Sequence, residues 1–298
     1  PALDSEELAA EMAELYWMAL CRDIPFAQWA GDATIGDAIN SLKKLDWFRA
    51  NRAVTGSTDV LASSQARRRI LRGPGDTFTL SELFRGVTPG EQIGPYLSQF
   101  LLAGSRGVNG NDLAHAHADG FIAYGAVRVD QRVRQAPANI NYMTTFDEWL
   151  DVQNGANLRG REAPYIGYRF MATPRDLATY VHYDALYEAY LNACLLLLSV
   201  GAPFDPGLPF LRNDAIDKQT GFAQFGGPHI LSLVTEVATR ALKAVRYQKY
   251  NVHRRCRPEA VGGRLHQLAT LPNGPVKDRL AVLQPMLTRL SSNAVKLD

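Results

Sequence analysis

Residues 227–260 read GPHILSLVTEVATRALKAVRYQKYNVHRRCRPEA, and this stretch is the strongest indication of the fold class. Gly227 and Pro228 predict a helix start, because proline is well tolerated at the first helical position, where its missing N–H is not needed. Apolar residues then recur at helical spacing as the stripe Leu231, Val234, Ala238, Ala241 and Val245. The pattern predicts a long amphipathic helix whose last turns carry positive charge.

That charge is concentrated in residues 246–260, where Glu259 is the only acid. It stands beside one histidine and five cations, namely Arg246, Lys249, Arg254, Arg255 and Arg257. One or two cations would complement the negative end of the helix dipole, at about 0.3–1 kcal/mol each. Five cations exceed that need and repel one another, so the cluster predicts a site for an anion.

Lys249 and Arg257 are the pair best placed to share that anion. If the helix continued, they would lie ~12 Å apart along its axis, within reach of two long side chains. Pro258 biases Arg257 away from helical geometry and lets it turn back toward Lys249. A lysine point charge and an arginine fork are standard donors to phosphate-like groups, so the spacing predicts an oxyanion site.

The remainder of the chain is close to neutral. Across 298 residues, 32 basic and 30 acidic side chains leave a net charge of +2, which argues against a general nucleic-acid coat, and a hydrophobic content of 46% can bury a core. Its cysteines lie far apart without CxxC spacing, which predicts neither a disulfide framework nor a zinc site. The opening residues lack a signal-peptide pattern. We expect a soluble chain, since the most apolar run, residues 185–200, is too short and too polar to span a bilayer. The sequence does not indicate the cellular compartment.

Helix signals dominate the other segments. Asp4 and Glu7 read as a capping box, and Thr173 with Pro174 predicts a helix from about 174 to 200 that stops at Gly201. Further stripes are Leu8, Met12, Leu15, Tyr16 and Ala19, and, after a start at Thr88–Glu91, Ile93, Leu97, Phe100 and Leu101.

Extended structure is confined to residues 126–134, whose period-two alternation predicts a short ribbon at most. Residues 104–112, 135–144 and 201–228 predict long loops, which in compact domains are often functional or form interfaces. The fold class is therefore mainly α, a bundle of long helices with extended loops.

Three other features favour ordinary structural roles. His115 and His117 would face the same way only on a strand, and no third ligand accompanies them, so we expect a structural or surface role. The glycine-rich residues 104–112 lack the lysine of a phosphate loop and predict a turn. Cys256 lies among arginines, but no base is paired with it in the sequence, so we expect no nucleophile.

Asp214 and Asp217 lie in a probable loop within residues 208–222. Two carboxylates and nearby carbonyl oxygens suit a hard cation such as calcium. Turn-forming aspartates explain the same residues equally well, and the spacing is not that of an EF-hand. From the residues alone, both interpretations stay open.

Residues 248–263, QKYNVHRRCRPEAVGG, resemble the first active-site segment of the vanadium-dependent haloperoxidases, in particular the marine algal and cyanobacterial bromoperoxidases. The family pattern is a lysine, an arginine eight positions later and then a proline, which here are Lys249, Arg257 and Pro258. Residues 10–26, 143–155 and 222–229 are also similar to the algal enzymes. The resemblance therefore spans nearly the whole chain and implies a helical fold related to that of acid phosphatases.

The resemblance implies a function and a set of ligands. Vanadate would be the cofactor, its oxygens held by Lys249 and Arg257 as catalytic residues. Hydrogen peroxide would oxidise bromide to hypobromous acid, which halogenates organic acceptors. The family also implies a homo-oligomer without nucleic-acid or membrane partners, and a calcium ion before the lysine-bearing helix, here with Phe210, Asp214, Asp217 and Gln219 as ligands.

One departure from the family pattern concerns the metal ligand. The family's later Ser-Gly-His segment and its still later Arg-and-His segment are absent, and no histidine follows His266. None of the six histidines occupies the position of the vanadium ligand. We therefore expect residues 1–298 to form a single incomplete α-helical domain, completed by a missing C-terminal segment or a second chain.

Two other functions remain open at this point. An acid phosphatase would use the same lysine and arginine to hold the phosphate of a phosphomonoester. A non-catalytic helical assembly subunit would use the basic cluster to bind the acids of a partner or a nucleic acid.

Overall fold

The computed structural model describes residues 2–48, 78–86, 93–105, 116–117, 120–209 and 221–292. Helices predominate in these ranges, which confirms the mainly-α class. The α-helices are α1 (Glu6–Cys21), α2 (Ala33–Leu42), α4 (Phe146–Gln153), α5 (Pro174–Tyr183), α6 (Glu188–Ser199), α7 (Gly227–Tyr247), α8 (Pro258–Thr270), α9 (Pro275–Arg279) and α10 (Gln284–Ser291). No helix in these ranges combines the length and apolar character needed to cross a bilayer.

The remaining elements are short. The 3-10 helices are η1 (Phe26–Gly31), η2 (Asp46–Phe48), η4 (Gln99–Leu101) and η6 (Ala281–Leu283), and η5 (Gln248–His253) is a π-helix. The strands are β1 (Gly104–Ser105), β2 (Ala116–His117), β3 (Phe121–Tyr124), β4 (Val127–Asp130), β5 (Val133–Arg134) and β6 (Tyr168–Arg169), paired as β1–β2, β3–β4 and β5–β6.

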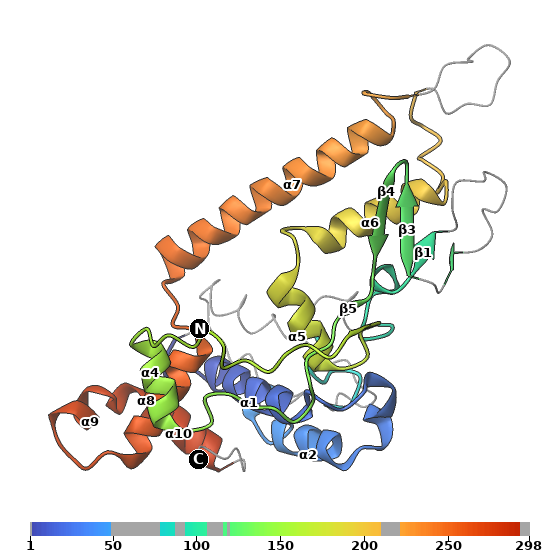
Figure 1. Cartoon of the computed structure of the whole chain (residues 1–298). Helices are drawn as coiled ribbons and strands as arrows, with labels where there is room; N and C mark the ends of the chain where they lie inside the picture. The colour runs from blue at the N-terminus through green and yellow to red at the C-terminus, as the bar shows by residue number, and fades with distance from the viewer. Residues whose placement is uncertain are drawn as a thin grey trace, which may run out of the picture.

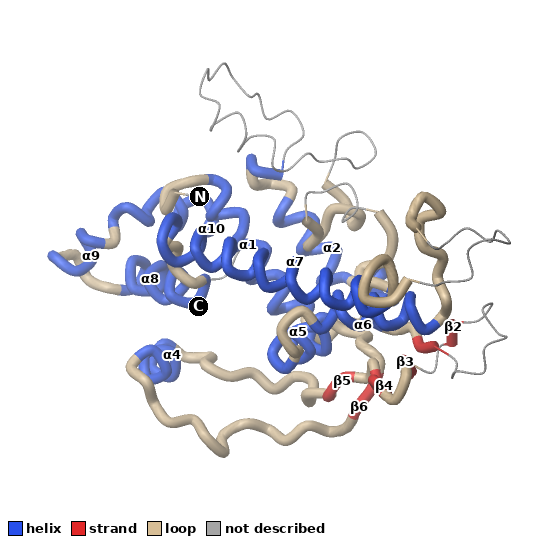
Figure 2. Tube along the Cα trace, turned by 90° about the horizontal axis from the view of Figure 1, so that it is seen from above, coloured by secondary structure: helices blue, strands red, loops and turns tan. Residues whose placement is uncertain are grey.

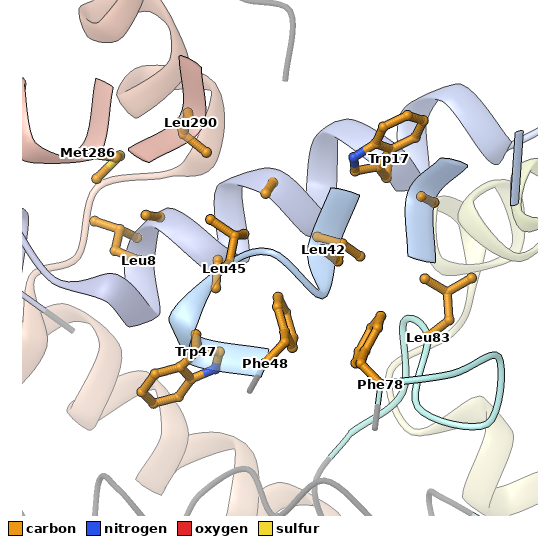
Figure 3. Close-up of a cluster of buried hydrophobic side chains, with 14 of the residues drawn as sticks. Leu8, Trp17, Leu42, Leu45, Trp47, Phe48, Phe78, Leu83, Met286 and Leu290 are labelled. Carbon is orange, nitrogen blue, oxygen red and sulfur yellow. The ribbon is translucent and has the colours of Figure 1, made fainter. Parts of the chain in front are cut away.

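Segments from both ends of the chain share the largest hydrophobic core (Figure 1). α1 and α2 pack together, and α8, η6 and α10 contribute to the same cluster from the C-terminal side. In Figure 3, Leu8 of α1 lies beside Met286 and Leu290 of α10, and the rings of Phe48 and Phe78 are 4.8 Å apart between centroids. Burial of this apolar surface, at roughly 25 cal/mol per Å², joins the two ends into one packed unit.

The start of α1 differs from the expectation. Ser5, rather than Asp4, is the N-cap, and its Oγ accepts a hydrogen bond from the Leu8 N–H at 3.1 Å. The predicted capping box with Glu7 is therefore wrong by one residue, because the extended backbone that a cap needs falls at Ser5. The predicted stripe is also only partly correct, since Leu15 is exposed while three alanines are buried in its place.

The predicted start of the helix at residue 174 is confirmed. The Thr173 Oγ1 accepts from the Asp176 N–H at 3.2 Å, and the Asp176 carboxylate accepts from the Thr173 N–H at 3.1 Å. These reciprocal bonds satisfy two donors that a helix start would leave unpaired. The predicted stop is also correct, because Gly201 follows α6 with a φ of 64°.

A single helix from 174 to 200 is nevertheless wrong, since α5 and α6 are separate elements. Tyr187 has a left-handed backbone, with a φ of 61°. The Glu188 carboxylate accepts from the Ala185 N–H at 2.7 Å, so the chain makes a new helix start where the apolar periodicity predicted continuity. A side-chain bond to the backbone offers the chain an alternative to the helical ladder.

The predicted helix over residues 88–101 is wrong where it can be examined. Its start at residues 88–91 lies outside the described residues. Residues 93–98 are irregular, and only η4 is helical. Gly94 has a φ of 91°, and Pro95 provides no N–H for a helical bond, so these two residues override the apolar spacing.

The period-two segment 126–134 contains the strands β4 and β5 as expected, but they pair with β3 and β6, which lie outside it. β3 and β4 make an antiparallel hairpin in which Tyr124 pairs with Val127, and Gly125 has a φ of 59° in the turn. Ile122 on β3 is buried against Leu195 and Leu196 of α6. The hairpin and α6 therefore form a second, smaller cluster.

α7 connects the smaller cluster to the main core (Figures 1 and 2). Its first turns touch the smaller cluster through Leu231. Within the described part of the chain, no residue of α7 is buried. At its far end, η5 and a short extended run lead to α8, which belongs to the main core.

Candidate oxyanion-binding site

The end of α7 widens from an α-helix into the π-helix η5. The Arg254 N–H donates to the Lys249 carbonyl at 3.1 Å, which closes a turn between residues five apart. Arg254 then adopts a left-handed conformation with a φ of 46°, which is strained for a residue other than glycine. Single π-turns of this kind are rare overall, and many of those that occur lie at functional sites.

This turn corrects the predicted geometry of the basic cluster. The helix stops at His253, so the ~12 Å separation calculated for a helix that continues to Arg257 does not apply. Arg257 has an extended backbone, with a φ of −67° and a ψ of 151°, and is the N-cap of α8. Its departure from helical geometry before Pro258 is therefore confirmed.

The Arg257 side chain is open to solvent and lightly engaged. It is 80% exposed, and its guanidinium forms an ion pair with Glu259, with Nε 2.7 Å from Oε1. The other N–H groups of a guanidinium remain donors when one of them is occupied. Arg257 can therefore bind an oxyanion while Glu259 orients it.

Lys249 is exposed at the start of η5. Its Nζ lies 5.2 Å from the centroid of the Tyr250 ring, a cation–π distance. In the described residues it forms no ion pair, and the same is true of Arg246 and Arg254. A lysine without a competing carboxylate and an arginine with spare donors fit a vanadate- or phosphate-like group held by charge.

An ion pair that sequence reasoning missed holds the segment against the main core. The Arg255 guanidinium donates to the carboxylate of Glu11 on α1. The two residues are 244 positions apart, so no local pattern contains a signal for this contact. One of the five cations is therefore structural, which reduces the repulsion within the cluster.

α8 is fixed from another side by α4. A Cβ built on Gly263 would lie 2.2 Å from Trp149 Cζ2, so α4 approaches α8 at a distance that only glycine permits. The Phe146 ring is stacked on the His266 ring, with centroids 5.0 Å apart and planes inclined by 16°. Residues 143–155 and the start of α8, which both carry the family resemblance, therefore lie against each other.

The start of α7 is fixed by a tight turn. A Cβ on Gly226 would lie 2.3 Å from the Gly221 carbonyl oxygen, so the backbone on the two sides of the turn is too close for a side chain at this position. Phe225 has a φ of 57°, and its N–H donates to His229 Nδ1 at 3.0 Å. This turn sets the direction of α7 and, through it, the position of Lys249.

Other predicted residues are not brought to this site. The calcium candidates Phe210, Asp214, Asp217 and Gln219 lie outside the described residues, as does His115. The backbone of His117 is in β2, but its side chain is likewise outside them. All three cysteines are free thiols, of which only Cys256 is exposed. Among the described residues, no three His, Cys, Asp or Glu side chains are grouped to hold a metal ion.

Known proteins match the chain along most of its length. No family model matches it. It is 50% identical over 275 residues to the vanadium-dependent bromoperoxidase of Corallina pilulifera, and 35% identical over 268 residues to that of Ascophyllum nodosum. The two alignments cover 88% and 89% of this chain but 44% and 42% of those proteins.

A solved structure agrees with the sequence matches. The second vanadate-dependent bromoperoxidase of Ascophyllum nodosum, a homohexamer, matches 98% of this chain and 43% of its own, with a TM-score of 0.66 and 26% identity. The resemblance seen in residues 248–263 is confirmed by these matches. The chain spans less than half the length of the relatives it matches.

Proposed function

We propose that this chain is a portion of a vanadium-dependent bromoperoxidase and supplies the cationic part of its vanadate site. The observation that supports this most strongly is the 50% identity to the Corallina pilulifera enzyme over 88% of the chain. Lys249, Arg257 and Pro258 match the family's motif within that length. The structure adds that Lys249 stands in a π-turn and Arg257 at a helix start, both exposed to an incoming anion.

The proposed reaction combines hydrogen peroxide, bromide and a proton into hypobromous acid and water, and hypobromous acid then halogenates an organic acceptor. Bound vanadate supplies the Lewis acidity that activates the peroxide. Lys249 would hold an oxygen of the bound oxyanion by a charge-assisted hydrogen bond and would withdraw electron density from it. Arg257 offsets the negative charge of the oxyanion with donors that Glu259 already orients.

A further segment completes the proposed site. Lys249 and Arg257 hold an anion by charge and hydrogen bonds, but neither can coordinate vanadium. The resemblance implies an imidazole ligand that has no matching position in residues 1–298. We infer that a C-terminal continuation or a second polypeptide provides it, within a homo-oligomer like that of the homohexameric relative.

A calcium ion in the loop before α7 is part of the same proposal. The ligands would be the Phe210 carbonyl and Asp217, joined by Asp214 and Gln219. An ion that binds only to the folded state must stabilise that state. Removing calcium with a chelator should therefore lower the melting temperature of the complete protein, and readdition should restore it. An unchanged melting temperature would exclude a structural calcium ion.

An assay of the complete protein separates the proposed function from its enzymatic rival. A phosphatase would use Lys249 and Arg257 to hold phosphate, but the identity to bromoperoxidases supports the peroxidase. Bromination of a dye is measured with bromide and peroxide, with and without vanadate, alongside hydrolysis of a phosphomonoester. We expect vanadate-dependent bromination. Phosphomonoester turnover without bromination would reject the proposal. Absence of both activities, together with DNA binding whose affinity falls steeply with salt, would favour an assembly role.

A further inference from the structure

A cavity lies where α5 ends and α6 begins, apart from the candidate oxyanion site. Its volume is about 210 Å³, and η4, β5, α5 and α6 all contribute to its walls. In Figure 1, α6 turns away from α5 at this point. We call it the α5–α6 cavity; its less exposed lining includes Leu101, Gln131, Val133, Met171, Tyr180 and Asn192. No lining residue belongs to the basic segment 246–260.

The break between the two helices gathers polar residues around the α5–α6 cavity. Four lining residues follow one another at intervals of four positions, namely Tyr180 and Asp184 at the end of α5 and Glu188 and Asn192 on α6. Along one continuous helix they would form a single polar stripe. Tyr187, with a left-handed φ of 61°, interrupts the helix in the middle of that stripe. Strained backbone of this kind clusters at functional sites, and here it folds the stripe around a cavity.

Asn192 brings an unpaired oxygen to the cavity, although its side chain is only 4% exposed. The Gln131 Nε2 donates to the carbonyl oxygens of Phe100 and Ala103, at 2.7 Å each, which fixes the orientation of the Gln131 amide. The Gln131 Oε1 therefore accepts from the Asn192 Nδ2, at 3.3 Å. The Asn192 Oδ1 is then left without a hydrogen-bond partner among the described residues. A buried amide oxygen of this kind needs a donor from water or a ligand.

Tyr180 adds a second unpaired group. Its hydroxyl is buried and has no hydrogen-bond partner within the described part of the chain. Burial raises the pKa of Tyr180 to about 12, and the negative charges of Glu188 and Asp184 add to the rise. The hydroxyl therefore stays protonated at neutral pH, and both carboxylates lie close enough to act on it electrostatically.

The charges around the α5–α6 cavity favour a cation. Three carboxylates and two guanidinium groups line it. Arg132 donates to both oxygens of Asp130, so this pair is neutral. The second guanidinium, Arg134, lies over a tyrosine ring at 4.7 Å from the centroid. Asp184 and Glu188 form no ion pair in the described ranges, and their charge is left to attract a ligand.

We infer that the α5–α6 cavity binds a small primary amine in its ammonium form. An ammonium group has three N–H donors, and the acceptors for them are the Asn192 Oδ1 and the carboxylates of Asp184 and Glu188. Val133 and Met171, which are both buried, offer an apolar wall to a short alkyl chain. Pockets for drug-sized ligands measure about 300–1,000 Å³, so this cavity suits a smaller molecule. The inference goes beyond the proposed function and does not depend on it.

Calorimetric titration of the complete protein at neutral pH tests the inference. The probe is butylammonium. Butanol and butyltrimethylammonium are matched controls, because the first lacks the charge and the second keeps the charge but lacks N–H donors. We expect saturable binding of butylammonium and no saturable binding of either control at the same concentrations.

Two variants locate the bound amine. Glu188→Gln removes a charge, but its side-chain oxygen can still accept from the Ala185 N–H, so the start of α6 is kept. Asn192→Leu removes the unpaired oxygen at similar volume. Each should weaken butylammonium binding at least about tenfold, the loss expected for one charge-assisted hydrogen bond. Glu236→Gln, which removes an exposed carboxylate of α7, is the control and should bind as wild type does.

Each contrary result overturns the inference. Equal affinity for butanol would show that the cavity selects for apolar surface, and equal affinity for butyltrimethylammonium would show that N–H donors are not needed. Absence of binding would leave water as the occupant that satisfies the buried groups. Wild-type affinity in Glu188→Gln would place the amine elsewhere, and this variant decides the question if Asn192→Leu does not fold.

Discussion

At the residue scale, neighbouring cations of one cluster have different partners and therefore different roles. Arg255 reaches Glu11 on α1 and anchors the segment, while Arg257 is held by Glu259 two positions away. Lys249 lies near the Tyr250 ring and keeps its charge free of carboxylates in the described structure. Composition shows only the total positive charge of the cluster. The geometry distinguishes Arg255, which anchors the segment, from Lys249 and Arg257, which are candidates for binding an anion.

Removal of either candidate ligand should weaken anion binding. In the complete enzyme, Lys249→Ala and Arg257→Ala should each reduce vanadate affinity by at least ~1.5 kcal/mol, the low end for a charge-assisted hydrogen bond. Lys243→Ala, which removes a lysine from the polar side of α7, is the matched control and should retain affinity. Equilibrium titration with vanadate measures all three, and wild-type affinity in Lys249→Ala would contradict the assignment.

A second residue-scale prediction concerns acid stability. The Arg175 guanidinium donates to both oxygens of Asp23, at 2.5 and 2.7 Å, and this hydrogen bonding lowers the pKa of the Asp23 carboxyl despite its partial burial. A lowered folded-state pKa contributes stability that is present above the ordinary carboxyl value and is lost as pH falls through the folded value.

Asp23→Asn should therefore be less stable than wild type at pH 7, and the difference should close as the pH falls below about 4. Urea unfolding at several pH values measures the difference. Asp37→Asn, which removes an exposed carboxylate of α2, is the control and should show little difference at any pH. A constant gap between wild type and Asp23→Asn down to pH 2 would show that the ion pair does not create it.

At the element scale, side-chain bonds and glycines decide where helices begin and how closely they pack. Ser5 and Thr173 cap α1 and α5 through their hydroxyls. Glycine fixes the turn before α7 and the close approach of α4 to α8. These contacts hold both ends of the basic segment, since α7 precedes it and α8 follows it.

Adjacent glycines of α8 provide a paired test of this packing. Gly263→Ala should destabilise the protein by about 1–3 kcal/mol, because the new methyl group would meet the Trp149 ring at 2.2 Å. Gly262→Ala meets nothing closer than Met12 Cε at 3.9 Å, so it should be neutral or stabilising through its better helix propensity. Thermal unfolding compares them, and equal melting temperatures would refute the close contact.

At the scale of the whole molecule, α7 spans two packed clusters while most of its own surface stays exposed. The main core joins α1, α2, α8 and α10, and the smaller cluster joins α6 to the β3–β4 hairpin. A helix of 21 residues with an exposed apolar face is costly in water. We therefore expect residues 1–298 to represent part of a larger packed unit.

Residues 1–298 should consequently show no bromide peroxidation by themselves. Lys249 and Arg257 can retain an anion, but the vanadium ligand of the proposed site has no matching histidine in this chain. The chain is supplied with vanadate, bromide and peroxide, and bromination of a dye is followed, with the complete enzyme as the positive control. Turnover comparable to that control would show that one of the six histidines is the ligand.

The sequence by itself determined the features whose chemistry is complete within a few residues. Gly227 and Pro228 start α7, the Thr173 capping box starts α5, and Gly201 ends α6, because each involves only neighbouring backbone groups. The mainly-α class and the likeness to bromoperoxidases could also be predicted from the sequence, since both depend on patterns along the chain. Lys249 and Arg257 were singled out in the same way, and their joint role stays a prediction.

The tertiary structure decided what depends on distant partners. The Arg255–Glu11 pair joins residues 244 positions apart, so no local pattern contains it. The break between α5 and α6 and the π-turn after Lys249 involve nearby residues, but the apolar periodicity does not reveal them. The contact of Gly263 with Trp149 joins residues more than a hundred positions apart. Apolar spacing reports which face of a helix is buried, whereas close packing decides where helices bend, stop and touch, because it satisfies atoms from several segments at once.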